Sequence, residues 1–131
     1  MRLRAILPVL LALGVFVQIL IGESGLAGGV LRDIHATIGL IGLALTAYAI
    51  AAPRGGRPLR IYVSVLFLLV ILQAILGLIL YGIFYTDLEL FELVEVIHRY
   101  NAYLMLVVGL VGGVLVGRFR RVSGEGVAKS G

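Results

Sequence analysis

Cysteine is missing from the 131-residue sequence. Its absence excludes disulfide bonds, thiolate metal sites, iron–sulfur clusters and the covalent attachment of a c-type haem. Tryptophan is missing too, so the aromatic side chains that anchor a protein at a membrane interface would have to be tyrosines. Five tyrosines lie at suitable places: Tyr62, Tyr81, Tyr85, Tyr100 and Tyr103.

Charged residues are scarce. They make up 14% of the chain, whereas soluble domains average about 25%. Four mainly apolar stretches each have about the length that a helix needs to cross roughly 30 Å of hydrocarbon. The sequence therefore predicts an all-α membrane protein, an antiparallel bundle of four transmembrane helices in a single domain that spans residues 1–131. The predicted spans are residues 5–22, 30–52, 61–84 and 90–117, followed by a flexible basic tail at 118–131.

The few charges are distributed unevenly. Nine of the eleven basic residues precede the first span, fill the second loop or follow the last span: Arg2, Arg4, Arg54, Arg57, Arg60, Arg118, Arg120, Arg121 and Lys129. Six of the seven acidic residues lie in or near the first and third loops: Glu23, Asp33, Asp87, Glu89, Glu92 and Glu95. Because basic loops stay on the cytoplasmic side, both termini are predicted inside. The net charge of +4 thus reflects topology and contact with the lipid bilayer, and indicates no nucleic-acid partner.

The N-terminus admits a second interpretation. Arg2 and Arg4, an apolar stretch and the small residues at 25–29 would also suit a cleaved signal peptide. The apolar stretch is long for a signal peptide, and an internal repeat includes it. We therefore predict that the first helix is retained.

The internal repeat joins the two halves of the chain. The first and third spans both contain Gln-x-x-x-Gly, beginning at Gln18 and Gln73. Each is followed by an acidic loop and then by a span that carries one of the two histidines, His35 and His98. At 1.5 Å rise per residue, the glutamine and the histidine of each half come to matching depth. The pattern favours two tandem helical hairpins related by duplication.

The two histidines are the strongest candidates for a site. In an up-down-up-down bundle the second and fourth helices run parallel, so His35 and His98 can face each other at one depth near the outer face. Two neutral imidazoles that converge in an apolar site suit axial ligation of a b-type haem. Zinc would require three or four ligands. The alternative is that each histidine simply bonds to a backbone carbonyl or a hydroxyl group.

The neighbours of the histidines fit a flat, anionic ligand. Gly39 and Gly42 share a helical face with His35 and leave room for a macrocycle. Arg32 and Arg99 are the only basic residues on the acidic side, which suits pairing with haem propionates. The alternative for these two arginines is anchoring at the membrane interface.

Three further side chains are candidates. Gln18 and Gln73 are amides within apolar spans and need partners. They could orient an imidazole or contact the porphyrin edge, or else form hydrogen bonds between helices. Glu95 lies three residues before His98 and could relay protons or stabilise a cationic intermediate. Its alternative is a solvated charge in an acidic loop.

Small residues line the last span. Gly109, Gly113 and Gly117 recur every four residues. This spacing is typical of close helix packing, and a homodimer contact is a second possibility.

Together these features resemble one four-helix half of haem A synthase. They comprise two Gln-x-x-x-Gly helices, each followed by a histidine-bearing helix, and the segment "EVIHR". The resemblance covers nearly the whole chain and is closest to the compact archaeal form with one half. It implies that one haem lies between His35 and His98 near the outer face, and that haem O is oxidised to haem A. The family's Glu-x-x-His motif corresponds to Glu95, His98 and Arg99.

Two departures from the family bear on catalysis. The Glu-x-x-His motif usually sits on the second helix of the family, whereas here it sits on the fourth, and Arg32 stands at the equivalent place before His35. The cysteine pair of the family's outer loop is missing. A chain with one site would also need a dimer to hold both a substrate haem and an electron-transferring haem.

Three functions therefore remain open. The first is a haem A synthase-like oxidoreductase of the cytoplasmic membrane with its site toward the outer face, working beside a haem O synthase. The second is a b-type cytochrome that carries electrons for a quinone or a respiratory oxidase. The third is an assembly or scaffold protein without a cofactor.

Overall fold

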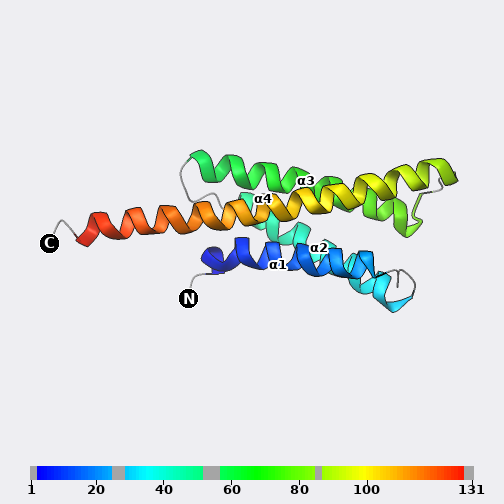
Figure 1. Ribbon diagram of the computed structural model, residues 1–131, viewed down its shortest axis with the longest axis horizontal. Helices are drawn as coiled ribbons and strands as arrows, with labels where there is room; N and C mark the ends of the chain where they lie inside the picture. The colour runs from blue at the N-terminus through cyan, green and yellow to red at the C-terminus, as the bar shows by residue number, and fades with distance from the viewer. Residues whose placement is uncertain (1–2, 25–28, 52–56, 85–86, 129–131) are drawn as a thin grey trace.

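The computed structural model describes residues 3–24, 29–51, 57–84 and 87–128. These residues form four helices and no strand, so the all-α fold is confirmed (Figure 1). The helices are α1 (Leu3–Glu23), α2 (Val30–Ala51), α3 (Arg57–Tyr81) and α4 (Leu88–Ala128).

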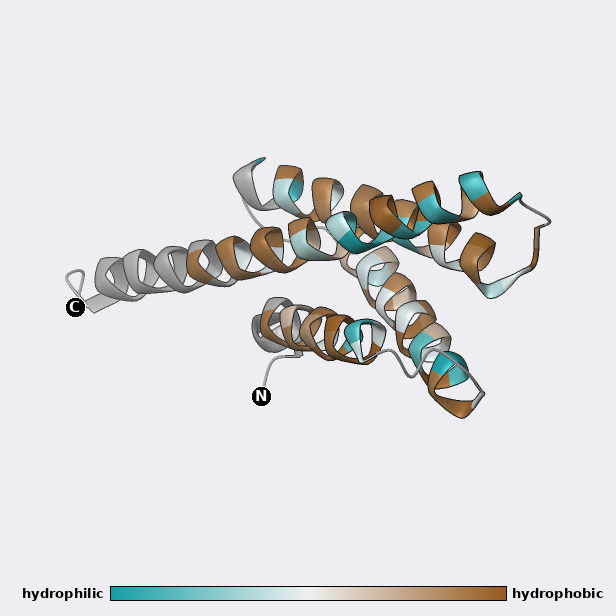
Figure 2. Ribbon diagram, turned by 45° about the vertical axis from the view of Figure 1, so that its right-hand side comes forward, coloured by the Kyte–Doolittle hydropathy of each residue, from teal (hydrophilic) through white to brown (hydrophobic). Residues whose placement is uncertain are grey.

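Three of the four helices are long and apolar enough to cross a membrane. The three segments are Val30–Ala51, Arg60–Tyr81 and Leu88–Gly112. The apolar part of α1, Val9–Glu23, is shorter. Most large apolar side chains of the described residues lie on the surface, and Figure 2 shows hydrophobic residues along all four helices. A water-exposed surface of this kind would be unfavourable, so the chain is consistent with a membrane protein.

The four helices contact one another in a closed ring. In Figure 1, α1 and α3 run from left to right, while α2 and α4 run the opposite way. Residues of α1 contact α2 and α4, and residues of α3 contact the same two helices. No contact of this kind links α2 with α4 over the described residues. The two histidine-bearing helices are therefore diagonal neighbours, and the space between them is open to side chains from all four helices.

The end of α3 differs from the sequence prediction. The helix ends at Tyr81 and not at Phe84 because Gly82 adopts φ 92°, in the left-handed region. The amide of Gly82 donates to the carbonyl of Ile79 (3.0 Å), and that of Ile83 donates to Leu78 (3.2 Å). These two bonds are the Schellman motif that satisfies the last carbonyls of a helix.

The helix α4 is longer than the predicted span at both ends. It begins at Leu88, where Asp87 caps it by accepting a hydrogen bond from the amide of Leu90 (2.8 Å). It continues to Ala128, so the segment predicted as a flexible basic tail is helical up to that residue. No proline follows Pro58 in the sequence, so nothing in this segment removes a backbone donor from the helix.

The buried core lies along the seam between α3 and α4. Tyr62, Leu66 and Val70 of α3 pack with Met105 of α4. A Cβ atom on Gly112 would overlap the Tyr62 ring, so only glycine fits there.

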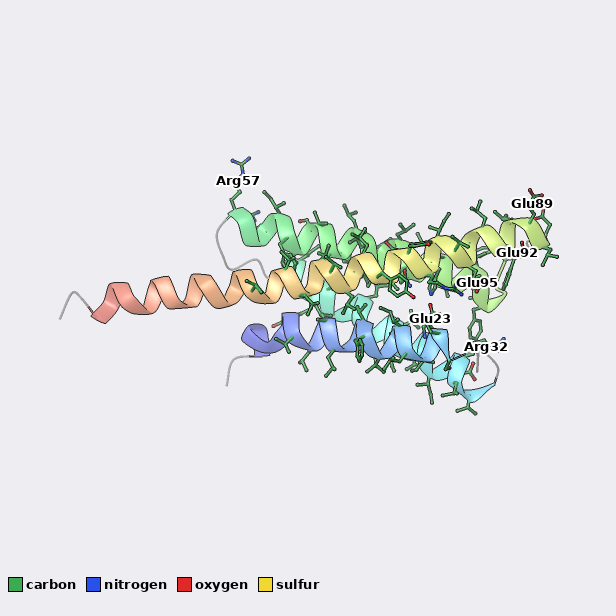
Figure 3. The ribbon with its side chains drawn as sticks, in the orientation of Figure 1. Glu23, Arg32, Arg57, Glu89, Glu92 and Glu95 are labelled. Atoms are coloured by element: carbon green, nitrogen blue, oxygen red, sulfur yellow. The ribbon has the colours of Figure 1, made fainter. Side chains whose placement is uncertain are left out.

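Labelled charged side chains lie near opposite ends of α3. In Figure 3, Arg57 lies at the start of α3, and Glu23, Arg32, Glu89, Glu92 and Glu95 lie toward the other end of that helix. The ends of the described residues thus differ in charge, as the sequence pattern predicts for the two sides of a membrane.

Candidate functional site

The structure brings His35 of α2 and His98 of α4 together. Their ring centroids lie 6.1 Å apart, and the ring planes are inclined by 51°. Both side chains are half-buried. Because their helices do not contact each other directly over the described residues, the two imidazoles reach toward each other across the space between four helices.

A cavity of about 570 Å³ opens beside the two rings. Its volume falls within the range of about 300–1,000 Å³ that is typical of cofactor and ligand sites. Most of its lining is apolar, and side chains from all four helices contribute to it. The sequence-predicted residues that line it are Gln18, Arg32, His35, Gly39, Gly42, Gln73, Glu95, His98 and Arg99.

The spacing of the rings suits one metal between them. A metal–imidazole bond is about 2 Å long, so two imidazoles on opposite sides of one metal have centroids roughly 6 Å apart. Among the described residues, no group of three or more His, Asp or Glu side chains could hold a metal ion. A haem needs only two ligands from the protein because the porphyrin supplies four nitrogens. The donor set therefore fits a haem better than a bare metal ion.

Ring nitrogens of both histidines lack partners. The Nδ1 atoms of His35 and His98 are buried and make no hydrogen bond with the described residues. Buried polar atoms without a partner cost about 1–3 kcal/mol each and often mark a site whose ligand completes them.

The first half of the repeat holds His35 by its backbone. Gln18 of α1 donates from Nε2 to the backbone carbonyl of His35 (2.7 Å), so this amide fixes α1 against α2 and leaves the imidazole free. A Cβ atom on Gly22 would lie 3.8 Å from Cε1 of His35. A Cβ atom on Gly39 would lie 3.2 Å from the Gln18 amide. Gly39 thus makes room for Gln18, and Gly22 lies beside the ring.

The second half of the repeat holds His98 by its ring. Nε2 of Gln73 lies 3.1 Å from Nε2 of His98. Asn101 of α4, which is 6% exposed, donates to Oε1 of Gln73 (2.7 Å) and to the carbonyl of Leu69 (3.0 Å). A Cβ atom on Gly77 would lie 3.2 Å from Cε1 of His98. The two halves therefore share their pattern and differ in which atom of the histidine the glutamine binds.

Gly42 opens directly into the cavity. Apart from the adjoining residues and the backbone of α2 itself, no atom lies within 4 Å of a Cβ placed at this position, so the space beside α2 there is open. By contrast, Gly109 is buried against α1, where a Cβ would lie 3.3 Å from that of Ala12. Gly109 therefore packs against α1 of the same chain. The side-chain positions of Gly113 and Gly117 lie outside the described part of the chain.

Arg99 and Glu95 form an ion-pair cluster at the mouth of the cavity. Nη2 of Arg99 lies 2.9 Å from Oε1 of Glu95, and Nε of Arg99 lies 3.1 Å from Oε1 of Glu23. Glu23 also accepts a hydrogen bond from the hydroxyl of Tyr103 (2.9 Å). About half of the Arg99 side chain is exposed, so the cluster contacts both the cavity and the surroundings and ties α1 to α4.

Arg32 belongs to a second cluster at the same end. Its guanidinium carbon lies 4.4 Å from the centroid of the Tyr81 ring, and its Nε lies 3.8 Å from Asp33. The hydroxyl of Tyr81 donates to Oδ1 of Asp33 (2.9 Å), which ties α2 to α3. The two arginines predicted to act alike thus have different partners.

The sequence prediction omitted three residues of the site: Gly22 and Gly77 lie beside the rings, and Asn101 bonds to Gln73. Gly22 and Gly77 recur in the repeat, and that recurrence was a signal for a shared role beside each histidine. Asn101 is the only asparagine of the sequence and follows His98 by three residues, on the same helical face. A single buried amide one turn from a candidate ligand was the signal that could have found it.

Comparisons with known proteins give no relative. No protein-family model, curated protein or solved structure matches the chain.

Proposed function

We propose that this chain is a membrane b-type haem protein with His35 and His98 as axial ligands. The observation that carries the proposal is the pair of imidazoles, 6.1 Å apart between their centroids, beside a largely apolar cavity of about 570 Å³. No described residue bonds to a ring nitrogen of His35, so its imidazole is available to a ligand. The site takes only two protein ligands, which suits a porphyrin and no simple metal ion.

The orientation of the protein belongs to the same proposal. Four transmembrane helices place both termini and the end that carries Arg57 in the cytoplasm, in the cytoplasmic membrane of the cell. The histidine site then lies toward the outer face, beside the acidic end. The separation of Arg57 from the labelled acidic residues in Figure 3 supports this orientation.

The enzymatic function that fits best is haem A synthase-like oxidation of haem O to haem A. The bound haem would be the substrate, and the electrons removed from its ring methyl group would have to pass to a second, electron-transferring haem held by a dimer partner. The chain would contribute two imidazoles to hold it, Arg32 and Arg99 to pair with its propionates, and Glu95 to accept or donate a proton at the cavity edge. Arg99 would have to exchange Glu23 or Glu95 for a propionate, and both of these pairs are half-exposed.

A second candidate is a b-type cytochrome that only transfers electrons to a quinone or a respiratory oxidase. The ion pair that Glu95 forms favours this electron-transfer function. This carboxylate is already paired with Arg99 at 2.9 Å, and no matching glutamate precedes His35. An electron carrier needs the two ligands and no carboxylate for proton transfer.

Haem binding is tested first with the purified protein. We expect a Soret band and a sharp α-band in the reduced protein, and we expect both bands to be lost in His35→Ala and His98→Ala. A wild-type protein purified without haem from haem-replete cells would refute the proposal and leave a scaffold protein as the better interpretation.

The enzymatic function is tested by co-expression with a haem O synthase and analysis of the extracted haems. Glu95→Gln should abolish formation of haem A while haem remains bound. Glu92→Gln is the matched control, because Glu92 lies on the same helix and does not line the cavity. If the wild-type protein forms neither haem A nor a hydroxylated intermediate, the electron-carrier function replaces the enzymatic one.

A further inference from the structure

The two proposed ligands are held in unequal ways. His35 is fixed through its backbone carbonyl by Gln18, and no described residue bonds to its ring nitrogens. The ring of His98 is in contact with Gln73 through Nε2, at 3.1 Å. On binding a metal, His35 gives up no hydrogen bond of its ring, whereas His98 must give up one.

A chain of amides sets the direction of the bond to His98. Asn101 donates to the carbonyl of Leu69, which can only accept, so its Nδ2 atom is the one near Gln73. Gln73 must therefore accept at Oε1 and donate from Nε2. The Nε2 atom of His98 is then the acceptor, and the proton of a neutral His98 ring resides on Nδ1.

The bond occupies the lone pair that a metal would use. With its proton on Nδ1, the imidazole has a single lone pair for coordination, on Nε2. The same nitrogen can therefore bond either to Gln73 or to a metal. A movement of the ring is enough for this exchange, and no proton has to be transferred. The half that contains His35 has no equivalent, because Ile38 stands three residues after His35, where Asn101 follows His98.

We infer that His98 is the exchangeable ligand of the proposed haem site, and that Gln73, positioned by Asn101, is the partner that receives its ring when it leaves the metal. This inference rests on the proposed haem binding. It assigns the fixed ligand to His35. The position that His98 vacates would take a small neutral ligand, such as a diatomic gas, in the cavity that Glu95 also lines.

The hydrogen-bond chain is tested first on haem-free protein, independently of the proposed function. The chain has only two histidines, so the spectrum of imidazole-¹⁵N-labelled protein in detergent contains two rings, assigned with His35→Ala. We expect His98 to carry its proton on Nδ1 in the wild type, and we expect that population to fall in Asn101→Leu. Ala44→Leu, on the exposed side of α2 and outside the cavity, is the control and should leave the His98 signals unchanged. A wild-type His98 protonated on Nε2 would overturn the inference.

Ligand exchange is tested on reduced, haem-loaded protein by titration with carbon monoxide. The wild type should bind it. Gln73→Leu should bind it about five- to tenfold more weakly, the equivalent of about one hydrogen bond, because His98 then has no second partner. Ala44→Leu should stay within about twofold of the wild type, since Ala44 is exposed and does not line the cavity. The α-band of each variant reports whether both ligands are still bound before the titration.

Two results would overturn the inference while haem binding stands. One is a haem-loaded wild type that binds no carbon monoxide. The other is Gln73→Leu binding carbon monoxide as tightly as the wild type. A wild type that holds no haem would instead refute the proposed function, and the tautomer of His98 would still be measured separately.

Discussion

Gly42 provides the sharpest test of whether the cavity is built for a ligand. It lies inside α2, and apart from the adjoining residues and the helix's own backbone no atom lies within 4 Å of a Cβ placed there. Alanine is favoured over glycine inside a helix by about 0.8–1 kcal/mol. We therefore expect Gly42→Ala to raise the free energy of unfolding of the haem-free protein by about that amount. Thr46 bonds to the backbone carbonyl of Gly42, so that contact is kept.

Haem binding should weaken when the side chain at position 42 is large. A larger side chain in Gly42→Leu would occupy part of the 570 Å³ cavity. Extra volume in a packed site costs about 1–3 kcal/mol, which corresponds to roughly 5- to 150-fold weaker haem binding. The measurements are denaturant unfolding of the haem-free protein in detergent and haem titration followed by Soret absorbance.

Ala44→Leu is the control for this pair of measurements. Ala44 lies two residues later on the same helix, on its exposed side, and does not line the cavity. It should leave haem affinity within about twofold of the wild type, since exposed substitutions change free energies by no more than about 0.5 kcal/mol. The reasoning fails if Gly42→Leu binds haem like the wild type, or if Ala44→Leu weakens binding equally.

Three more predictions test the neighbouring contacts. Gly77→Ala would place a methyl group 3.2 Å from Cε1 of the adjacent imidazole, whereas Gly22→Ala would leave 3.8 Å. We expect a shifted α-band only in the first, at a cost of about 0.5–1.5 kcal/mol for turning the ring, and equal spectra would contradict this. Glu23→Gln should lower the free energy of unfolding by about 0.2–1 kcal/mol at low salt, through the ion pair between α1 and α4. The loss should shrink at high salt, and a salt-independent loss would count against an electrostatic cause. Because native cysteine is absent, a membrane-impermeant thiol reagent applied to intact cells should label Ser24→Cys and spare Arg57→Cys, and the reverse pattern would invert the proposed orientation.

The sequence predicted the helical segments well because each depends on local composition. Apolar stretches of sufficient length indicated the helices, and three of the four are long and apolar enough to cross a membrane. The end of α3 was missed by three residues, although Gly82 carries the information. A glycine within a mainly apolar stretch does not reveal by itself whether it continues a helix or ends it.

The partners of the polar side chains were harder to predict. Arg32 and Arg99 look equivalent in the sequence, yet one lies over Tyr81 and the other pairs with Glu23 and Glu95. Tyr81 and Glu23 belong to other helices than the arginines they contact, and Glu95 lies one helical turn before Arg99. Their choice depends on the rotation of each helix about its axis, which packing decides.

The sequence by itself determined that four helical segments form, that two histidines lie at similar depth and that no cysteine contributes to a site. These properties follow from residue type, length and the fixed rise of a helix. Only the tertiary structure decided that the two rings approach to 6.1 Å, and that Gln18 binds a backbone while Gln73 binds a ring. The two halves share one sequence pattern, but the rotation of each helix about its axis decides which atoms of the glutamine and the histidine meet. In the second half a single buried amide, Asn101, also sets the direction of the hydrogen bonds of Gln73.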